Sequence, residues 1–263
     1  MFSFLKGEAS LHAAKSDIGK KYTHNEDSFF LPEADATWEI TEEKIDAGGR
    51  LYLLCDGMGG GQAGEVASSL ASGWLARDFY GDPKEEIPPV RRLAELACET
   101  NARLYALAEA HDAYKGMGTT LVAAHVRDGL LSLVSMGDSR AYLFRNGTLR
   151  QLTEDHSEIW PLYKNGSLTR EELRTHPRSH VLTKALVVSE TITEDDLFMD
   201  TESLEDGDFL LLCSDGLTDM VPEEEILGIL GKKKKMAWKA EALVDAANRH
   251  GGRDNITVVL VRA

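Results

Sequence analysis

Residues 51–64 read LYLLCDGMGGGQAG and join an apolar run, an aspartate and a glycine-rich turn in immediate succession. The run Leu51–Cys55 predicts a buried strand that ends at Asp56. From Glu65 onward, apolar residues recur at helical spacing and predict a helix to about Tyr80. A carboxylate at the end of a buried strand, beside a backbone with few side chains, suits binding of a hard cation or a phosphate.

The same glycines allow a different interpretation. Gly59, Gly61 and Gly64 satisfy the G-x-G-x-x-G dinucleotide fingerprint after a predicted strand. That fold needs a second strand with an acidic residue roughly 20 residues further on, but here Asp78 closes the helical stretch and a loop follows. A dinucleotide-binding oxidoreductase is therefore a weak alternative. The simplest interpretation is a tight strand-to-helix turn that an aspartate without a function happens to precede.

Length and composition restrict the class of protein. The chain has 263 residues, no internal repeat and no interdomain linker, so we expect one domain over residues 1–263. Its net charge of −15 argues against a nucleic-acid or anionic-membrane partner, because the long-range field repels phosphates. Cys55, Cys98 and Cys213 form no CxxC motif and predict buried, reduced thiols. Met1–Leu5 is too short for a signal-peptide core, and no run reaches transmembrane length, so we expect a cytoplasmic protein.

Hydrophobic periodicity predicts both helices and strands in the rest of the chain. The predicted helices are 91–111, one beginning at Pro222, and 237–249. The predicted strands are 119–126, 130–136, 141–145, 209–213 and 256–261. Asp128-Gly129 and Asn146-Gly147 predict hairpin turns, and we expect the first three of these strands to be antiparallel neighbours.

Three polar segments complete the chain. Residues 33–50 predict a loop or hairpin, and Lys232–Lys235 predict a solvated helix end. Residues 153–180, here called the flap, are rich in His, Pro and Gly. Within the flap, Thr169 and Glu172 form a capping box that predicts a short helix.

Five aspartates occupy a similar context, next to apolar runs and mostly beside glycine: Asp27, Asp56, Asp138, Asp215 and Asp254. Each alone is commonly a turn or cap residue. Several carboxylates that converge on one sheet edge repel one another, and divalent cations reverse that sign. Oxygen ligands without His or Cys select magnesium or manganese over zinc.

Seven motifs resemble, in order, those of the metal-dependent serine/threonine protein phosphatases of type 2C, and most closely the bacterial stand-alone catalytic members. They cover essentially the whole chain: Asn25-Glu26-Asp27, Asp56-Gly57-Met58-Gly59-Gly60, Gly116-Met117-Gly118-Thr119-Thr120, Gly137-Asp138-Ser139-Arg140-Ala141, Leu152-Thr153-x-Asp155-His156-Ser157, Ser214-Asp215-Gly216-Leu217 and Asp254-Asn255-Ile256-Thr257-Val258. The resemblance implies an α+β fold, a four-layer α-β-β-α sandwich with two central antiparallel sheets flanked by helix pairs.

The resemblance also implies a metal centre with two Mn²⁺ or Mg²⁺ ions per chain. Asp56 and the carbonyl of Gly57 would hold the ions, and Asp27, Asp215 and Asp254 would complete the ligand set, directly or through waters. Glu26 and Asn255 would support these ligands without being primary ones. Asp138, together with Asp215, would hold a third and weaker ion.

Such a centre explains phosphate ester hydrolysis without a covalent phosphoenzyme. Two ions bridge a water, lower its pKa and aim the resulting hydroxide at phosphorus, in line with the leaving oxygen. They also neutralise charge that develops on the phosphoryl oxygens. None of the three cysteines is followed by Arg six residues later, so the sequence has no Cys-x5-Arg phosphatase loop.

Two departures from the family concern substrate phosphate and the general acid. The family usually has an Arg where this chain has Tyr22, and a phenol cannot replace its bidentate contact. Lys21 or Arg178 of the flap could substitute for it. Met58 occupies a position where eukaryotic members often have His and bacterial members commonly have Met. The resemblance therefore implies that a metal-bound water or another residue, with His156 as a candidate, protonates the leaving oxygen.

The sequence thus predicts a cytoplasmic, manganese- or magnesium-dependent hydrolase of phosphoserine and phosphothreonine in proteins. Its partners would be phosphorylated substrates of a cognate Ser/Thr kinase, and we expect a monomer that binds neither nucleic acid nor membranes. The alternative is a catalytically weak phosphoprotein-binding regulatory module with the same fold. Tyr22 favours that alternative, and the intact aspartates count against it.

Overall fold

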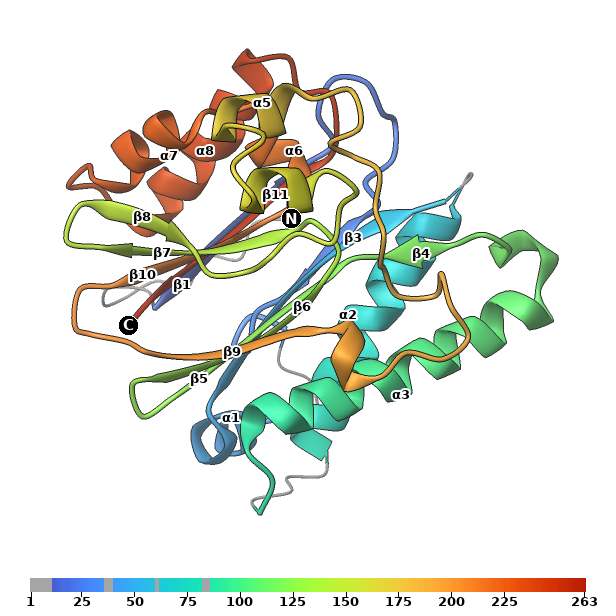
Figure 1. Cartoon of the computed structure of the whole chain (residues 1–263). Coiled ribbons are helices and arrows are strands. Elements are labelled where there is room, and N and C mark those ends of the chain that lie inside the picture. The colour runs from blue at the N-terminus through green and yellow to red at the C-terminus, as the bar shows by residue number, and fades with distance from the viewer. Residues whose placement is uncertain (1–10, 36–39, 60–61, 82–85) are drawn as a thin grey trace. The chain divides into compact units, whose positions relative to one another are not determined.

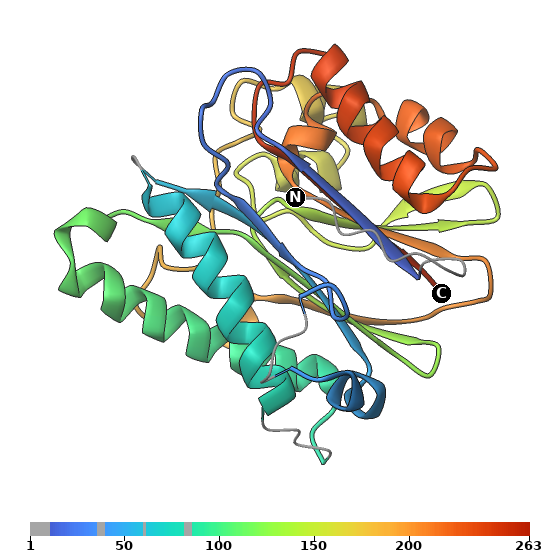
Figure 2. The same cartoon turned by 180° about the vertical axis from the view of Figure 1, so that it is seen from behind.

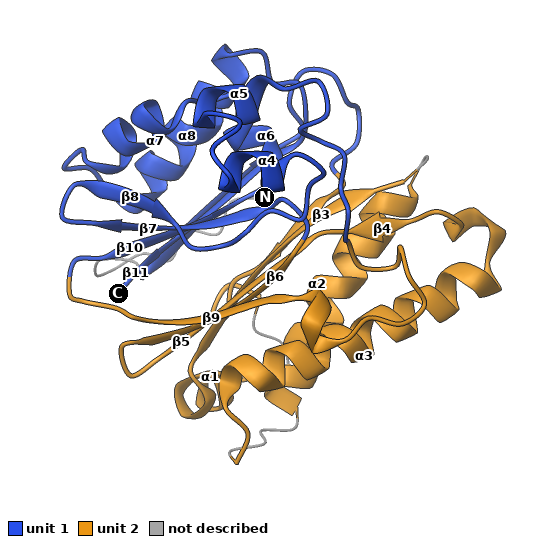
Figure 3. Cartoon of the chain, viewed as in Figure 1, with its two compact units in different colours: residues 1–25, 137–184, 207–263 blue, residues 26–136, 185–206 orange. Residues whose placement is uncertain are grey.

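The computed structural model describes residues 11–35, 40–59, 62–81 and 86–263. Contacts divide the chain into two compact units (Figure 3). Unit 1 comprises residues 1–25, 137–184 and 207–263, and unit 2 comprises residues 26–136 and 185–206. The single-domain count stays a prediction. Gly60 and Gly61 of the glycine-rich turn, and Met1–Leu5, lie outside the described residues.

Within the described part of unit 2, an antiparallel sheet has the strand order β2-β3-β5-β6-β9, and β4 pairs with β3 (Figure 1). Its strands are β2 Asp27–Phe30, β3 Arg50–Met58, β4 Gly118–Thr119, β5 Leu121–Arg127, β6 Leu130–Met136 and β9 Phe198–Ser203. The predicted turn between β5 and β6 is confirmed, because Asp128 and Gly129 both have positive φ, 53° and 74°.

The long helices of unit 2 lie against this sheet (Figure 2). Alternation along β3 directs Leu51, Leu53 and Cys55 to one face, where they share a core with the helices. Residues four positions apart form the matching face of α2: Ala67, Ala71 and Leu75. The helices of this unit are α1 Glu42–Gly48, α2 Ala63–Gly81, α3 Pro89–Ala110, and the 3₁₀ turns η1 Asp112–Tyr114 and η2 Glu194–Asp196.

Among the described residues of unit 1, the antiparallel sheet has the order β1-β11-β10-β7-β8. Its strands are β1 His12–Asp17, β7 Arg140–Arg145, β8 Thr148–Gln151, β10 Phe209–Cys213 and β11 Ile256–Arg262. Its helices are α4 Trp160–Lys164, α5 Arg170–Thr175, α6 Asp215–Thr218, α7 Glu223–Leu230 and α8 Met236–Arg249. Leu243 and Ala247 of α8 are fully buried and share a core with Val258 and Leu260 of β11.

The predicted class, an α+β fold with two antiparallel sheets and helices, is confirmed. Helices 91–111 and 237–249 and strands 130–136 and 209–213 are observed within two residues of their predicted bounds. The short helix predicted from the capping box is observed as α5, and both capping contacts between Thr169 and Glu172 are present. None of the helices that the structure describes is both long and apolar enough to cross a membrane.

Three local predictions are wrong. Residues 33–50 contain α1, which begins after Thr41, because this threonine caps the helix by accepting a hydrogen bond from the Lys44 amide. The strand from Leu51 does not end at Asp56 but continues to Met58, because β4 pairs with its last two residues. Strand β7 is not a neighbour of β6 but lies in the other sheet, between β10 and β8.

Candidate active site

In unit 2, Asp27 and Asp56 lie directly opposite each other on the neighbouring strands β2 and β3. Opposite residues of an antiparallel pair project to the same face, so these two carboxylates are neighbours. Two threonines fix the backbone of Asp56. The Thr120 hydroxyl accepts from the Asp56 amide at 2.9 Å, and the Thr119 hydroxyl donates to the Asp56 carbonyl at 3.0 Å. The Gly-Met-Gly-Thr-Thr motif therefore holds Asp56 in place.

Gly57 and Gly64, on either side of the glycine-rich turn, pack closely on Glu26. The Gly57 amide donates to the Glu26 carbonyl at 3.0 Å, and the Ser68 hydroxyl donates to the same carbonyl at 2.5 Å. A Cβ at Gly57 would lie 2.1 Å from the Gly64 carbonyl oxygen, and a Cβ at Gly64 would lie 2.3 Å from Glu26 Oε2. Glycine is needed at both positions because the backbones approach so closely.

In unit 1, Asp138 lies in the turn between β6 and β7 and is buried. Burial raises the pKa of Asp138, and the charges of Asp155 and Asp219 raise it further. Burial also raises the pKa of Asp219, with smaller increases from Asp155 and Asp254 and an opposing decrease from Arg140. Unit 1 therefore contains a group of carboxylates whose charges destabilise one another.

The motif around Asp215 builds a sharp corner between β10 and α6. Asp215 is the first residue of α6, and Asp219 follows one helical turn later. A Cβ at Gly216 would lie 1.9 Å from the Asn255 carbonyl oxygen, so glycine lets α6 approach the segment that precedes β11. The Ser214 hydroxyl accepts from the Thr257 amide at 3.0 Å and fixes the same corner.

Asn255 connects Asp254 to the loop that carries the candidate phosphate residues. Its side-chain amide donates to the carbonyls of Ile18 and His24, at 3.0 and 3.1 Å. Lys21 belongs to that loop and is exposed. Burial raises the pKa of Asp254, and the Lys21 ammonium partly offsets this rise. A cation and a metal-ligand candidate thus lie close together in unit 1.

The other candidate phosphate residues are less directly supported. Tyr22 is 53% exposed. Arg178 forms an exposed ion pair with Glu158 at 2.5 Å. His156 Nδ1 accepts a hydrogen bond from the Gly137 amide at 3.1 Å, and the His156 amide donates to the Gly137 carbonyl at 2.8 Å. His156 therefore holds the turn that contains Asp138.

Arg140, Asp155 and Asp219 are site residues that the sequence analysis gave no role. Arg140 Nε and Nη2 donate to both oxygens of Asp155, the shortest at 2.6 Å, and both side chains are buried. This ion pair ties the start of the flap to β7. Asp219 was detectable because it follows Asp215 by one helical turn, whereas the Arg140–Asp155 contact depends on tertiary structure.

The candidate ligands fit a hard divalent cation by their chemistry, since they are carboxylates and a carbonyl. Asp27, Asp56 and Gly57 belong to unit 2, and Asp138, Asp215 and Asp254 belong to unit 1. Within the described ranges, no group of three or more His, Cys, Asp and Glu side chains is gathered closely enough to hold an ion. The complete ligand set therefore stays a proposal.

The cysteines do not provide a nucleophile. Burial raises the pKa of the Cys55 thiol, and burial raises that of Cys213 to about 12. Cys98 is half-buried, and its pKa is also raised, mainly by burial. None of these thiols is a reactive thiolate near neutral pH.

Comparison with known proteins places this arrangement in a family. A family model described as protein phosphatase 2C matches residues 31–248. The serine/threonine phosphatase stp of Listeria welshimeri is 38% identical over 259 residues, which cover 95% of each chain. The crystal structure of the Mycobacterium tuberculosis serine/threonine phosphatase PstP/Ppp superposes with a TM-score of 0.80 at 37% identity, covering 95% of this chain and 97% of that one.

A further crystal structure, the catalytic domain of the serine/threonine protein phosphatase PstP in complex with two manganese ions, has a TM-score of 0.79 at 36% identity. The alignment with this structure covers 95% of the present chain and 96% of the PstP chain. The relatives cover about 95% of the chain, and the family model includes Asp56, Asp138 and Asp215, whereas Asp27 and Asp254 lie outside the residues that it matches. The chain belongs to the protein phosphatase 2C family.

Proposed function

We propose that this protein hydrolyses phosphoserine and phosphothreonine in proteins with the help of divalent metal ions. The observation that carries the proposal is the facing pair Asp27 and Asp56, held beside a tightly packed glycine turn. Two facing carboxylates repel each other unless a cation lies between them. Relatives named serine/threonine phosphatases, and a manganese-bound neighbour, support the same reaction.

We propose that Asp27, Asp56, the Gly57 carbonyl, Asp215 and Asp254 hold two Mn²⁺ or Mg²⁺ ions. When bound, these ions supply a hydroxide nucleophile from a shared water and neutralise charge on the phosphoryl group. Asp138 is the candidate for a third, weaker site together with Asp215. The raised pKa values of Asp138 and Asp219, caused mainly by burial, support a cation there, because positive charge would stabilise their ionised forms.

The surrounding residues orient these ligands. Thr119 and Thr120 fix the backbone at Asp56, and Glu26 is packed behind Gly57. Asn255 holds the Lys21 loop beside Asp254. These contacts organise the ligands before any ion binds, which lowers the entropic cost of assembling the site.

Lys21 is the cation that we propose for the substrate phosphate. Its ammonium already acts on Asp254, and Tyr22 beside it cannot form the bidentate ion pair of an arginine. His156 uses Nδ1 as an acceptor from the Gly137 amide, so we propose it as a residue that orients the turn with Asp138 beside the phosphate. Arg178 is the weaker candidate, since it is paired with Glu158.

The likeness to bacterial phosphatases also suggests the setting. We propose phosphorylated proteins, the products of a cognate Ser/Thr kinase, as substrates. We further propose a cytoplasmic monomer. Gel filtration tests the oligomeric state: an apparent mass well above the 29.0 kDa of one chain would contradict a monomer.

Tyr22 favours a second candidate function, a regulatory module that binds phosphoproteins and turns them over weakly. Turnover of a small aryl phosphate with and without manganese separates the two. If the protein is a hydrolase, the aryl phosphate is turned over in the presence of manganese, and EDTA abolishes this turnover. The regulatory module predicts no turnover in either condition, together with retained binding of a phosphothreonine peptide.

Replacing Tyr22 by Arg tests the phosphate position. If Tyr22 lies at the substrate phosphate, Tyr22→Arg lowers KM for a phosphothreonine peptide by about tenfold, because a bidentate contact adds roughly 1.5 kcal/mol. Tyr22→Phe is the control and leaves KM unchanged. An unchanged KM in Tyr22→Arg would remove Tyr22 from the phosphate site and leave Lys21 as the candidate.

A further inference from the structure

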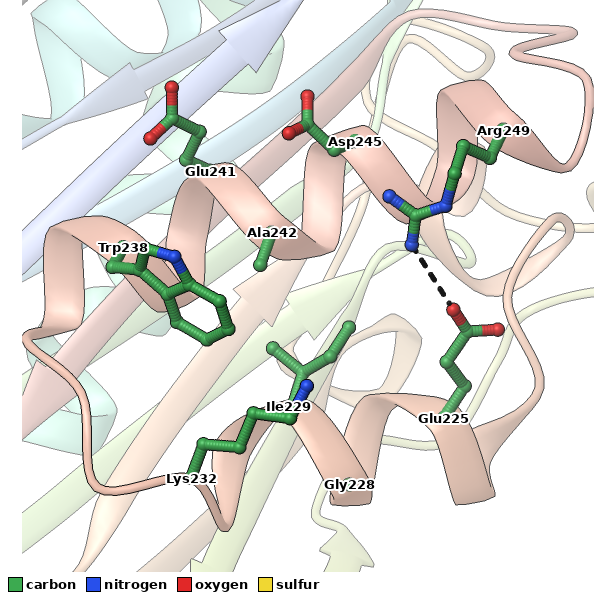
Figure 4. Close-up of a pocket in the computed structure, with 9 residues that line it drawn as sticks. All are labelled: Glu225, Gly228, Ile229, Lys232, Trp238, Glu241, Ala242, Asp245 and Arg249. Carbon is green, nitrogen blue, oxygen red and sulfur yellow. Dashed lines mark hydrogen bonds and ion pairs between the residues drawn. The ribbon is translucent and has the colours of Figure 1, made fainter.

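A groove of about 440 Å³ lies between α7 and α8 in unit 1 (Figure 4). Its volume is within the range of roughly 300–1,000 Å³ that is typical of ligand-binding pockets. None of its lining residues belongs to the seven motifs of the candidate active site. The groove therefore needs an explanation apart from the phosphatase reaction.

The floor of the groove is apolar and open. Ile229 of α7 and Ala242 of α8 lie between the helices, and the Trp238 ring forms one end (Figure 4). Trp238 is 37% exposed, which is large for an indole. A Cβ at Gly228 would meet no atom within 4 Å, so the α7 side of the groove has free space.

The α8 rim of the groove is acidic. Glu241 and Asp245 are exposed, lie one helical turn apart and project from the edge of α8 that is farther from α7, so they form the outer rim of the groove (Figure 4). Neither carboxylate forms an ion pair or hydrogen bond with any residue that the structure describes. In contrast, Glu225 at the far end is paired with Arg249 at 3.4 Å and with His250 at 2.7 Å. The unpaired negative charge of the groove is thus confined to the α8 rim.

The Trp238 end of the groove is basic, because two of the chain's own lysines lie over the indole, so the acidic part that a basic segment would use is the α8 rim. The ammonium groups of Lys232 and Lys234 lie 5.4 and 5.9 Å from the centre of the Trp238 ring. These distances are within the range of cation–π attraction. The chain as a whole has a net charge of −15, so long-range steering also favours a basic partner.

We propose that the groove between α7 and α8 is a docking site for a basic, partly apolar peptide segment of a partner protein. Apolar side chains of that segment contact Ile229, Ala242 and the space beside Gly228. Its Arg or Lys side chains pair with Glu241 and Asp245. The small size of the groove makes this a weak, reversible contact.

Fluorescence anisotropy of labelled, unphosphorylated peptides tests the proposal on the full chain. The peptide LRLRLR has both required properties, LELELE reverses the charge, and SRSRSR lacks the apolar side chains. LRLRLR is expected to bind at least about tenfold more tightly than either control, because it alone uses the floor and the rim. Equal binding of LRLRLR and LELELE, or no binding of LRLRLR, overturns the proposal.

Variants locate the binding. Glu241→Lys with Asp245→Lys reverses the rim charge and is expected to weaken LRLRLR binding by about tenfold or more. Gly228→Leu fills the floor and is expected to do the same. The control, Glu99→Lys with Glu109→Lys on α3, makes the same change in net charge on another exposed helix and should alter binding by less than about twofold.

Manganese-dependent turnover of an aryl phosphate and the thermal midpoint accompany each variant. Turnover should match wild type, since the groove holds none of the proposed catalytic residues. The thermal midpoint should not fall, and Gly228→Leu should raise it slightly, because leucine favours helix over glycine. The proposal is overturned if the groove variants bind LRLRLR with the same affinity as the control variant on α3. This outcome is independent of the proposed hydrolase function, which fails only if wild type shows no turnover.

Discussion

At the scale of single residues, Gly57 and Gly73 show two different uses of glycine. At Gly57 the backbone passes so close to Gly64 and Glu26 that a Cβ would lie 2.1 and 2.6 Å from their carbonyl oxygens. At Gly73, inside α2, a Cβ would meet nothing within 4 Å. The first glycine is required by packing, and the second only lowers helix propensity.

This difference predicts opposite effects of the same substitution. Gly57→Ala should lower the free energy of unfolding by about 2–4 kcal/mol, because backbone atoms must move to admit the methyl group. Gly73→Ala should raise it by about 0.5–1 kcal/mol, since alanine favours helix. Urea denaturation measures both values. A Gly57→Ala protein as stable as wild type would refute the close packing of the glycine turn.

The sequence identified the candidate ligand residues, but it did not predict the side-chain contacts that surround them. The motifs singled out Asp56 and Asp138, and the structure supplies the reasons for their local settings, the threonine contacts and the neighbouring carboxylates. The Arg140–Asp155 pair was not predicted, because the fifteen positions that separate these residues give no periodic signal. Such contacts depend on how β7 and the flap come together.

At the scale of secondary-structure elements, the flap is attached to the sheet of unit 1 by charged side chains. The Arg140–Asp155 pair lies at its start, and Arg170 of α5 contacts Gln151, Tyr142 and Glu223. Arg174 Nη1 also donates to the Asp219 carbonyl at 2.8 Å. These contacts hold the flap helix next to α6 and α7.

The buried position of the Arg140–Asp155 pair predicts a large effect of breaking it. Asp155→Ala should lower the free energy of unfolding by about 3–5 kcal/mol, because Arg140 is left as an unpaired buried charge. The matched control, Arg178→Ala, breaks the exposed pair with Glu158 and should cost about 0–1 kcal/mol. Chemical denaturation of both variants compares them. Equal, small effects would contradict the proposed anchoring of the flap.

Elements with strong periodicity were predictable, and those defined by partners were not. Strand β10 and helix α8 have continuous apolar patterns, so their bounds were predicted within one residue. Helix α1 buries only Ile45 and has too few apolar residues to show a helical period. The sheet that β7 joins is decided by pairing with β10, which is over sixty residues away in the sequence.

At the scale of the whole molecule, stability should depend on pH through three carboxyl groups that are proposed metal ligands or lie close to them. Burial raises the pKa of Asp138, Asp219 and Asp254 in the folded protein. A carboxyl with a raised folded pKa binds protons more tightly in the folded state than in the unfolded state. The metal-free protein therefore loses stability from these groups as pH rises above about 4, the ordinary value for Asp.

Removing one of these charges should stabilise the metal-free protein at high pH. Asp138→Asn in EDTA is expected to raise the free energy of unfolding at pH 8 by about 1–3 kcal/mol, since it removes an ionised buried carboxylate. The gain should shrink at pH 5, where wild-type Asp138 is largely protonated. Urea titrations at the two pH values measure it. A variant that is less stable than wild type at pH 8 would show that the charge is already compensated within the protein.

The central claim is that aspartates from distant parts of the sequence bind the metal ions that perform the reaction. Manganese titration by calorimetry, paired with turnover of a phosphothreonine peptide, tests it most directly in wild type, Asp56→Ala, Asp215→Ala and Met58→Ala. We predict two ions per wild-type chain, weaker binding and a loss of at least about a thousandfold in kcat for both aspartate variants, and a milder effect of Met58→Ala. Turnover near the wild-type rate by Asp215→Ala in the presence of manganese would contradict the claim.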